Sequence, residues 1–130
     1  MCGTIFIEVI VMKEDKLSEL SMQLSVDVLK LVKDLQAKHE TVISKQISRS
    51  ATNVCANIAE SKYGHSRADF IAKLEIALKE ANETAYWLKL IKLAKKIDTQ
   101  AQQFVTLESD CVALKAMLVS SIKTAKQGSE

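Results

Sequence analysis

The sequence of 130 residues contains no proline and only three glycines, Gly3, Gly64 and Gly128. Because glycine and proline are the strongest signals for a chain break, Gly64 marks the one interior point with such a signal. Leucine, alanine, lysine and glutamate are abundant, and this composition favours helices. The length is that of one domain, which can bury a core without disulfides or metals.

Aromatic residues make up 5% of the chain, which argues against RNA-binding modules that stack bases on aromatic platforms. The three cysteines, Cys2, Cys55 and Cys111, are odd in number and share no short spacing. This pattern argues against a disulfide framework and against a zinc ribbon. Cys55 and Cys111 fall on helical apolar stripes and are predicted to behave as small buried hydrophobes. A reducing compartment fits best, so we expect a cytoplasmic protein.

No apolar run is long enough to span a membrane, and the net charge of +2 identifies no partner. The N-terminal segment MCGTIFIEVIVM lacks the basic start of a signal peptide and carries Glu8. Its residues alternate in a strand-like pattern. We therefore expect residues 1–14 to form an extension outside the domain, either as an added edge element or because translation truly starts at Met12.

Four amphipathic stretches follow, at residues 15–38, 41–62, 67–97 and 99–126, with apolar residues at steps of three and four. Four long helices with short connections pack as an antiparallel up-down-up-down bundle. We therefore predict an all-α four-helix bundle over residues 15–126, followed by a short tail at 127–130.

Local signals mark three of the predicted helix ends. Gly64 suits a left-handed position after the second helix. Ser66 followed by Asp69 is typical of a capping box, and Thr99 followed by Gln102 is a weaker example. The first break, near residues 39–41, has neither glycine nor proline.

The second predicted helix carries a polar stripe beside its apolar stripe, which we call the polar seam. Its members are Gln46, Arg49, Asn53, Asn57 and Glu60. The remaining side of this helix is small and suits close approach of another helix: Ser48, Thr52, Ala56 and Ala59.

In a hairpin that turns near residues 64–66, two residues face each other when their numbers add up to about 130. This register places Arg49 near Glu80 and Glu83, and it places Glu60 near Lys73. Asn53 and Asn57 are expected to bond across helices, because buried polar groups without partners cost about 1–3 kcal/mol each. The seam is either a solvated face or a paired network, and the network lies inside the bundle or at a subunit interface.

The segment QISRSATNVCANIAES, at residues 46–61, resembles the signature of the bacterial four-helix-bundle proteins named after rRNA intervening sequences. That signature is Gln, Arg, a small residue and then Asn-Ile-Ala-Glu. The segment SRADFIAKLEIALKEANETAYWLKL resembles the third helix of the same family. The resemblance covers about residues 15–126. This chain carries Ser61 where family members usually carry glycine.

The resemblance implies a four-helix bundle that assembles as a ring-shaped homopentamer. The accessory variability protein of diversity-generating retroelements is similar; it binds nucleic acid and works with a reverse transcriptase. A gene's association with rRNA genes does not by itself imply that its product binds ribosomes.

Signals for catalysis are weak. His39 and His65 lie near opposite ends of the second helix, and neither has a partner at the spacing of a helical metal site. No histidine shares the helical face of Cys55, and the phosphate-loop and nucleophile-elbow motifs are missing. We therefore expect a protein that is not an enzyme and that has no metal site and no cofactor.

A basic run is the clearest functional signal. Lys89, Lys92 and Lys96 share one predicted helical face, and no acidic residue occurs between Tyr86 and Ile97. Lysines near a helix C-terminus also complement the helix dipole, so they have a structural explanation as well. Repeated around a ring, however, modest basic patches add to a strong field for phosphates.

Two functions remain open. The first is an oligomeric accessory protein that binds RNA or DNA without sequence specificity. The second is a structural or adaptor ring that recruits a protein partner without binding nucleic acid. The hydrophobic content of 48% is high for a small monomer and favours a homo-oligomer, with a pentamer as the first expectation.

Overall fold

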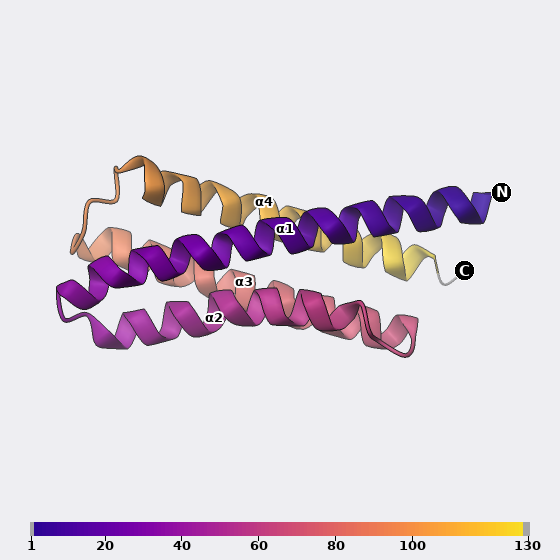
Figure 1. Ribbon diagram of the computed structural model, residues 1–130, viewed down its shortest axis with the longest axis horizontal. Coiled ribbons are helices and arrows are strands. Elements are labelled where there is room, and N and C mark those ends of the chain that lie inside the picture. Colours follow the sequence, from indigo (N-terminus) through magenta and orange to yellow (C-terminus); the bar gives the residue numbers. More distant parts are fainter. Residues whose placement is uncertain (1, 129–130) are drawn as a thin grey trace.

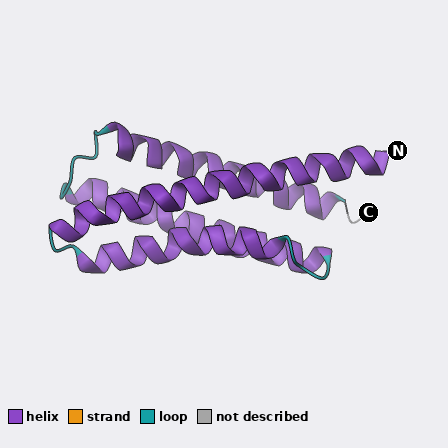
Figure 2. Cartoon of the chain, viewed as in Figure 1, coloured by secondary structure: helices purple, strands orange, loops and turns teal. Residues whose placement is uncertain are grey.

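The computed structural model describes residues 2–128, which form four helices joined by short connections (Figure 1, Figure 2). The helices are α1 (Cys2–Ala37), α2 (Thr41–Ser61), α3 (Arg67–Ala94) and α4 (Gln102–Gln127). No strand occurs within residues 2–128. Figure 1 shows that consecutive helices run in opposite directions and that both ends of the chain lie at one end of the molecule. The predicted all-α four-helix bundle is confirmed.

Each helix packs against its neighbours in sequence, and α1 also packs against α4, so the bundle encloses one core. The predicted stripes supply this core, because apolar residues at steps of three and four lie along one side of each helix. Fully buried examples are Leu24, Val54, Leu74 and Leu114, one from each helix. The core therefore runs along the whole bundle.

A set of small polar groups crosses the core. Ser25 Oγ on α1 donates to the carbonyl oxygen of Ala51 on α2 at 3.2 Å. Thr84 Oγ1 on α3 donates to Ser50 Oγ on α2 at 2.8 Å. Cys111 Sγ on α4 lies 3.6 Å from the carbonyl oxygen of Ala81 on α3. These bonds link all four helices and satisfy polar groups that would otherwise destabilise the core.

The N-terminal segment is helical, so the strand-like expectation for residues 5–12 is wrong. Apart from Glu8, both the odd and the even positions of this segment are apolar, so its alternation does not distinguish a strand from a helix. No proline or glycine separates it from the amphipathic stretch that follows. Once that stretch is helical, adding residues to the helix needs no new nucleation. Helix α1 therefore runs without a break across the predicted boundary at residue 14.

The first turn is made without glycine. His39 adopts a left-handed conformation with φ 61°. The His39 N–H donates to the carbonyl oxygen of Gln36 at 2.9 Å, and the Glu40 N–H donates to that of Leu35 at 2.9 Å. This pair of bonds is a Schellman motif, which satisfies the last carbonyl groups of α1.

Gly64 does not have the left-handed conformation predicted for it, since no described glycine has a positive φ. Gly64 instead allows its backbone to lie close to the first turn of α3. A Cβ atom at this position would lie 3.2 Å from Cβ of Asp69 and 3.3 Å from the Phe70 backbone nitrogen. The predicted cap at the start of α3 is confirmed, because Ser66 Oγ accepts from the Asp69 N–H at 3.1 Å.

The connection between α3 and α4 differs from its prediction. Helix α3 ends at Ala94, and Lys95 is left-handed with φ 54°. Asp98 Oδ1 accepts from the Gln100 N–H at 3.0 Å. Such a local turn competes with helical hydrogen bonding. Helix α4 accordingly begins at Gln102 with Ala101 as its N-cap, so the predicted Thr99 cap is wrong.

Candidate functional site

The polar seam is centred on Arg49, which projects from α2 towards α3. Its Nη1 atom lies 3.2 Å from Glu80 Oε2, and its Nη2 atom contacts Glu83 Oε2. Its Nε–H donates to Gln46 Oε1 at 3.4 Å. The α2–α3 hairpin thus brings Arg49 to the two glutamates at the register read from the sequence.

The other end of the seam is also paired across the hairpin, because Lys73 Nζ lies 2.7 Å from Glu60 Oε2. The two asparagines behave differently. Asn57 Nδ2 donates to the backbone carbonyl of Asn53 at 2.8 Å, one turn earlier in α2. The prediction that Asn53 and Asn57 bond across helices is therefore wrong for Asn57. The i−4 carbonyl lies within reach of its short side chain.

The seam lies at the surface of the single chain. The Arg49 side chain is 43% exposed, and those of Glu80 and Glu83 are 18% and 37% exposed. The network is thus formed between α2 and α3 of one chain but is not buried in the bundle core, whereas its placement at a subunit interface stays a prediction. The small side of α2 is also open: Thr52, Ala56 and Ala59 are exposed and Ser48 is half-buried.

The predicted lysine face is only partly formed. Lys89 and Lys92 are exposed on α3, and Lys92 Nζ lies 3.4 Å from Glu108 Oε2 on α4. Lys96 lies beyond the end of α3, and its Nζ is 3.6 Å from Glu40 Oε1. The prediction that three lysines share one helical face is therefore wrong for Lys96, since the left-handed Lys95 turns the chain away.

The groove between α3 and α4 gathers other lysines, and we call it the basic side. Two ion pairs bridge it, from Lys92 to Glu108 and from Lys126 to Glu75. A depression of about 410 Å³ lies near its far end, between Leu78 and the C-terminal part of α4. Its lysines are Lys92, Lys123 and Lys126, which bridge or line the groove, and Lys89 and Lys115, which helical spacing places on the same side of α3 and α4. Five lysines against two glutamates leave a net charge of about +3.

Tyr86 stands on α3 beside these lysines, three residues before Lys89, and is 72% exposed. Leu93, which is 69% exposed, and Val112, which is 64% exposed, lie on the same two helices. The basic side therefore combines cationic groups with an aromatic ring and open apolar surface.

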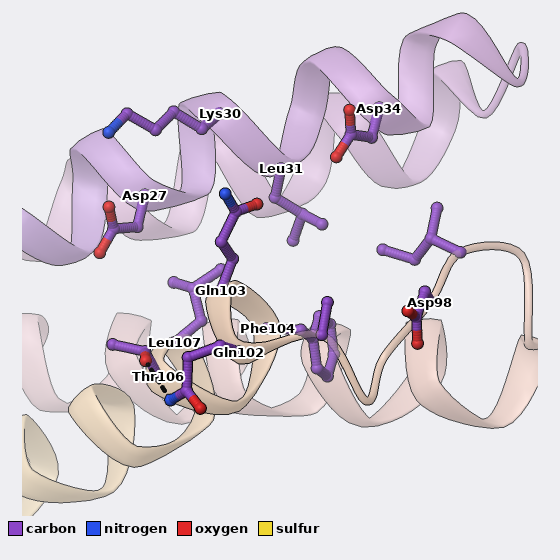
Figure 3. A pocket seen from close by; sticks show the side chains of 12 residues that line it. Asp27, Lys30, Leu31, Asp34, Asp98, Gln102, Gln103, Phe104, Thr106 and Leu107 are labelled. Atoms are coloured by element: carbon purple, nitrogen blue, oxygen red, sulfur yellow. Dashed lines mark hydrogen bonds between the residues drawn. The ribbon is translucent and has the colours of Figure 1, made fainter.

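The groove between α1 and α4 has the opposite charge, and we call it the acidic side. Its carboxylates are Asp27 and Asp34 on α1, Asp98 in the connection and Asp110 on α4, and Lys30 is its lysine. A cavity of about 320 Å³ opens there (Figure 3). Burial, and then the nearby charge of Asp27, raise the pKa of the Asp110 carboxyl above its ordinary value.

Cys111 lies in the core between the two sides of α4. Burial raises the pKa of its thiol to about 11. Its neighbour Lys115 opposes that rise but is outweighed. Because the thiolate is the reactive form, Cys111 is suited to packing and not to nucleophilic chemistry.

Within residues 2–128, no group of three His, Cys, Asp or Glu side chains is placed to hold a metal ion. In the same part of the chain, no helix has the length and apolar character needed to cross a membrane. The described surface carries charged grooves along the bundle. The arrangement suits binding to a charged partner.

These features define an all-α four-helix bundle with two oppositely charged grooves. The family model described as 23S rRNA-intervening sequence protein matches residues 13–120, and the chain belongs to that family. A comparison with curated proteins found no match.

The chain is also similar to a crystal structure from Bacteroides thetaiotaomicron, described as a protein with unknown function from the S23 ribosomal protein family. The two are 41% identical, with a TM-score of 0.79. The match covers 85% of this chain and 98% of that chain. The likeness therefore extends over nearly the whole bundle.

Proposed function

We propose that this protein is a non-enzymatic accessory protein that binds RNA or DNA through the basic side, without sequence specificity. The observation that carries this proposal is the excess of lysines in the α3–α4 groove around the exposed ring of Tyr86. Lysines neutralise phosphates and release condensed counterions, and this term is independent of sequence. A tyrosine adds stacking on bases, which is also tolerant of sequence.

The two ion pairs of the basic side do not oppose this function. Lys92 and Glu108 are 3.4 Å apart, and the Lys92 side chain is 56% exposed. Such exposed pairs contribute about 0–1 kcal/mol. A phosphate can therefore replace the carboxylate as the lysine's partner at small cost. Lys89 is exposed beside this pair and is a candidate for direct phosphate contact.

The test is fluorescence anisotropy with labelled single-stranded and duplex oligonucleotides over a range of salt. For duplex DNA the slope of log affinity against log salt is about −0.9 per phosphate neutralised. The triple variant Lys89→Gln, Lys92→Gln, Lys123→Gln should bind more weakly and with a flatter slope. Tyr86→Ala should weaken single-strand binding and leave the slope unchanged.

The matched control removes three lysines from α1, as Lys16→Gln, Lys30→Gln, Lys33→Gln. Both triple variants change the net charge by the same amount. If the two lose affinity equally, binding reflects overall charge and the basic side is not the site. An absence of binding to either oligonucleotide at low salt would reject the proposal and favour the adaptor ring.

We also propose that the chain assembles as a homo-oligomer, with a pentamer as the first expectation. Support comes from the open small side of α2 and from exposed apolar residues at both of its ends, Val42 at 75% and Tyr63 at 82%. Small side chains let another helix approach closely, and assembly would multiply the basic side around an axis. Multi-angle light scattering at micromolar concentration tests this. A stable monomer contradicts it.

Arg49→Ala connects the seam to assembly. In a single chain an ion pair as exposed as Arg49 with Glu80 contributes about 1 kcal/mol or less. Loss of one partner from a pair buried at an interface costs about 3–5 kcal/mol. A variant that dissociates or melts far earlier places the seam in an interface, whereas an unchanged midpoint shows that the seam is solvated.

A further inference from the structure

The cavity of the acidic side lies between two turns of α1 and the first turns of α4 (Figure 3). Its volume of about 320 Å³ is within the range of binding pockets. Apolar side chains form its floor, namely Leu31, Ile97, Phe104 and Leu107. The cavity can therefore hold an apolar group as well as contact a charged one.

The rim of this cavity carries negative charge that the chain does not balance. Figure 3 shows the Asp27 and Asp34 side chains directed from α1 towards α4, whereas the Lys30 ammonium group points away. Among the described residues neither aspartate has an ion pair, and Asp27 accepts one hydrogen bond, from Gln23 at 3.0 Å. Burial, and then the charge of Asp27, also raise the pKa of Asp110, so the negative charge of the groove extends to α4.

We propose that this groove is a docking site for a basic helical segment of a partner protein. Asp27 and Asp34 are seven residues apart on α1, which is about 10 Å along a helix axis. A docked helix with lysine or arginine at two positions seven apart places one cation at each aspartate. A leucine between those positions then faces the apolar floor, as in other helix-in-groove complexes.

The chemistry of the groove selects this occupant over others. The phosphate backbone of a nucleic acid is repelled by the aspartates. A free polyamine supplies cations but no branched side chain for the floor around Phe104. The groove lies on the opposite side of α4 from the basic side, so the protein could hold a basic protein and a nucleic acid together.

The experiment uses the full chain and fluorescence anisotropy with a labelled, alanine-based helical peptide. The peptide carries two lysines seven residues apart and leucines between them. A second peptide keeps the lysines but has alanine in place of leucine. Asp34→Asn and Asp27→Asn should each weaken binding of the first peptide about tenfold, and the second peptide should bind at least tenfold more weakly. Glu19→Gln, the same charge change elsewhere on α1, should leave binding unchanged.

Four results would overturn the proposal. The first is equal binding of both peptides, which shows that the floor is not used. The second is equal loss of affinity in Glu19→Gln and Asp34→Asn. The third is spermidine displacing the peptide at a lower concentration than the unlabelled peptide does. The fourth is self-association of the protein that Asp34→Asn abolishes, which would make a second copy the occupant.

This proposal is independent of nucleic-acid binding. The variant Lys89→Gln, Lys92→Gln, Lys123→Gln should bind the peptide as the unmodified protein does. Asp27→Asn and Asp34→Asn should not weaken binding to an oligonucleotide. Failure of one function therefore leaves the other standing.

Discussion

The two grooves that flank α4 differ in charge although they share one helix. Among the residues whose side chains are described, the groove towards α3 has five lysines and two glutamates, and the groove towards α1 has four aspartates and one lysine. Both rest on the same buried face of α4, which includes Leu107, Leu114 and Leu118. The shared helix core thus positions both surfaces, while the exposed residues decide what each surface attracts.

The largest expected effect comes from destabilising the helix core that supports both the basic side and the acidic side. Leu114→Ala should destabilise the fold by about 2–5 kcal/mol, because Leu114 is fully buried and the change leaves a cavity. Thermal melting and both binding assays should decline together. If one side kept full binding at a temperature where the other had lost it, the shared-core description would be wrong.

The next effect comes from reversing charge on one side at a time. Lys89→Glu with Lys92→Glu should reduce oligonucleotide affinity by more than tenfold, since each lost phosphate contact also reverses a charge. Asp27→Lys with Asp34→Lys should raise oligonucleotide affinity much less, because Phe104, the aromatic residue that lines the cavity of this side, is buried, whereas Tyr86 is exposed. Salt titrations of anisotropy measure both. Equal and opposite changes would indicate that total charge is what matters.

A smaller effect should come from neutralising one acid on each side. Asp110→Asn removes a carboxylate that burial, and then repulsion from Asp27, disfavour, and should raise the melting temperature at pH 7 by at most a few degrees. Glu75→Gln removes the partner of Lys126 and should lower it slightly. The two variants should therefore shift the melting temperature in opposite directions, and shifts in the same direction would contradict the difference between the two sides.

The Asp110 effect should depend on pH. Because the folded state raises the pKa of this carboxyl, its charged form destabilises the fold. The benefit of Asp110→Asn is therefore full at neutral pH. It should shrink as the pH falls through the raised pKa and vanish below the ordinary pKa of aspartate. Melting curves between neutral and acidic pH check this.

The smallest effect is expected at Cys111, between the two sides. With a thiol pKa of about 11, roughly one thiol in a thousand is ionised at pH 8. Alkylation of Cys111 by iodoacetamide should therefore be slow in the folded protein and fast in denaturant. Peptide mass mapping measures the reaction at Cys111 alone. Rapid labelling of folded protein would show that the α3–α4 contact opens readily.

Sequence reasoning was strongest where a repeated spacing was available. Steps of three and four located all four helices and the core, and a single hairpin register placed Arg49 opposite Glu80 and Glu83. It was weakest at the turns. The left-handed residues are His39 and Lys95, although glycine adopts this conformation more readily. Gly64 is not left-handed, and its missing side chain instead lets the backbone lie close to α3.

The acidic side was missed for a different reason. Asp27 and Asp110 lie far apart in the sequence, and each by itself resembles a solvated polar position on an amphipathic helix. Only the closure of α1 against α4 brings them together. A signal existed in the seven-residue spacing of Asp27 and Asp34 on one helix, but its meaning depends on which helix faces it.

The left-handed residues His39 and Lys95 offer a route to a sturdier molecule for further experiments. Each non-glycine residue in this conformation costs roughly 1–2 kcal/mol. Glycine there removes the strain at a cost of about 0.4–1 kcal/mol from greater freedom of the unfolded chain. His39 lies in the α1–α2 turn, apart from the residues that line the cavity and from the α3–α4 lysines, whereas Lys95 is two residues from Ile97 and three from Lys92. With His39→Gly an engineer could thus gain tolerance for disruptive surface substitutions without editing either surface.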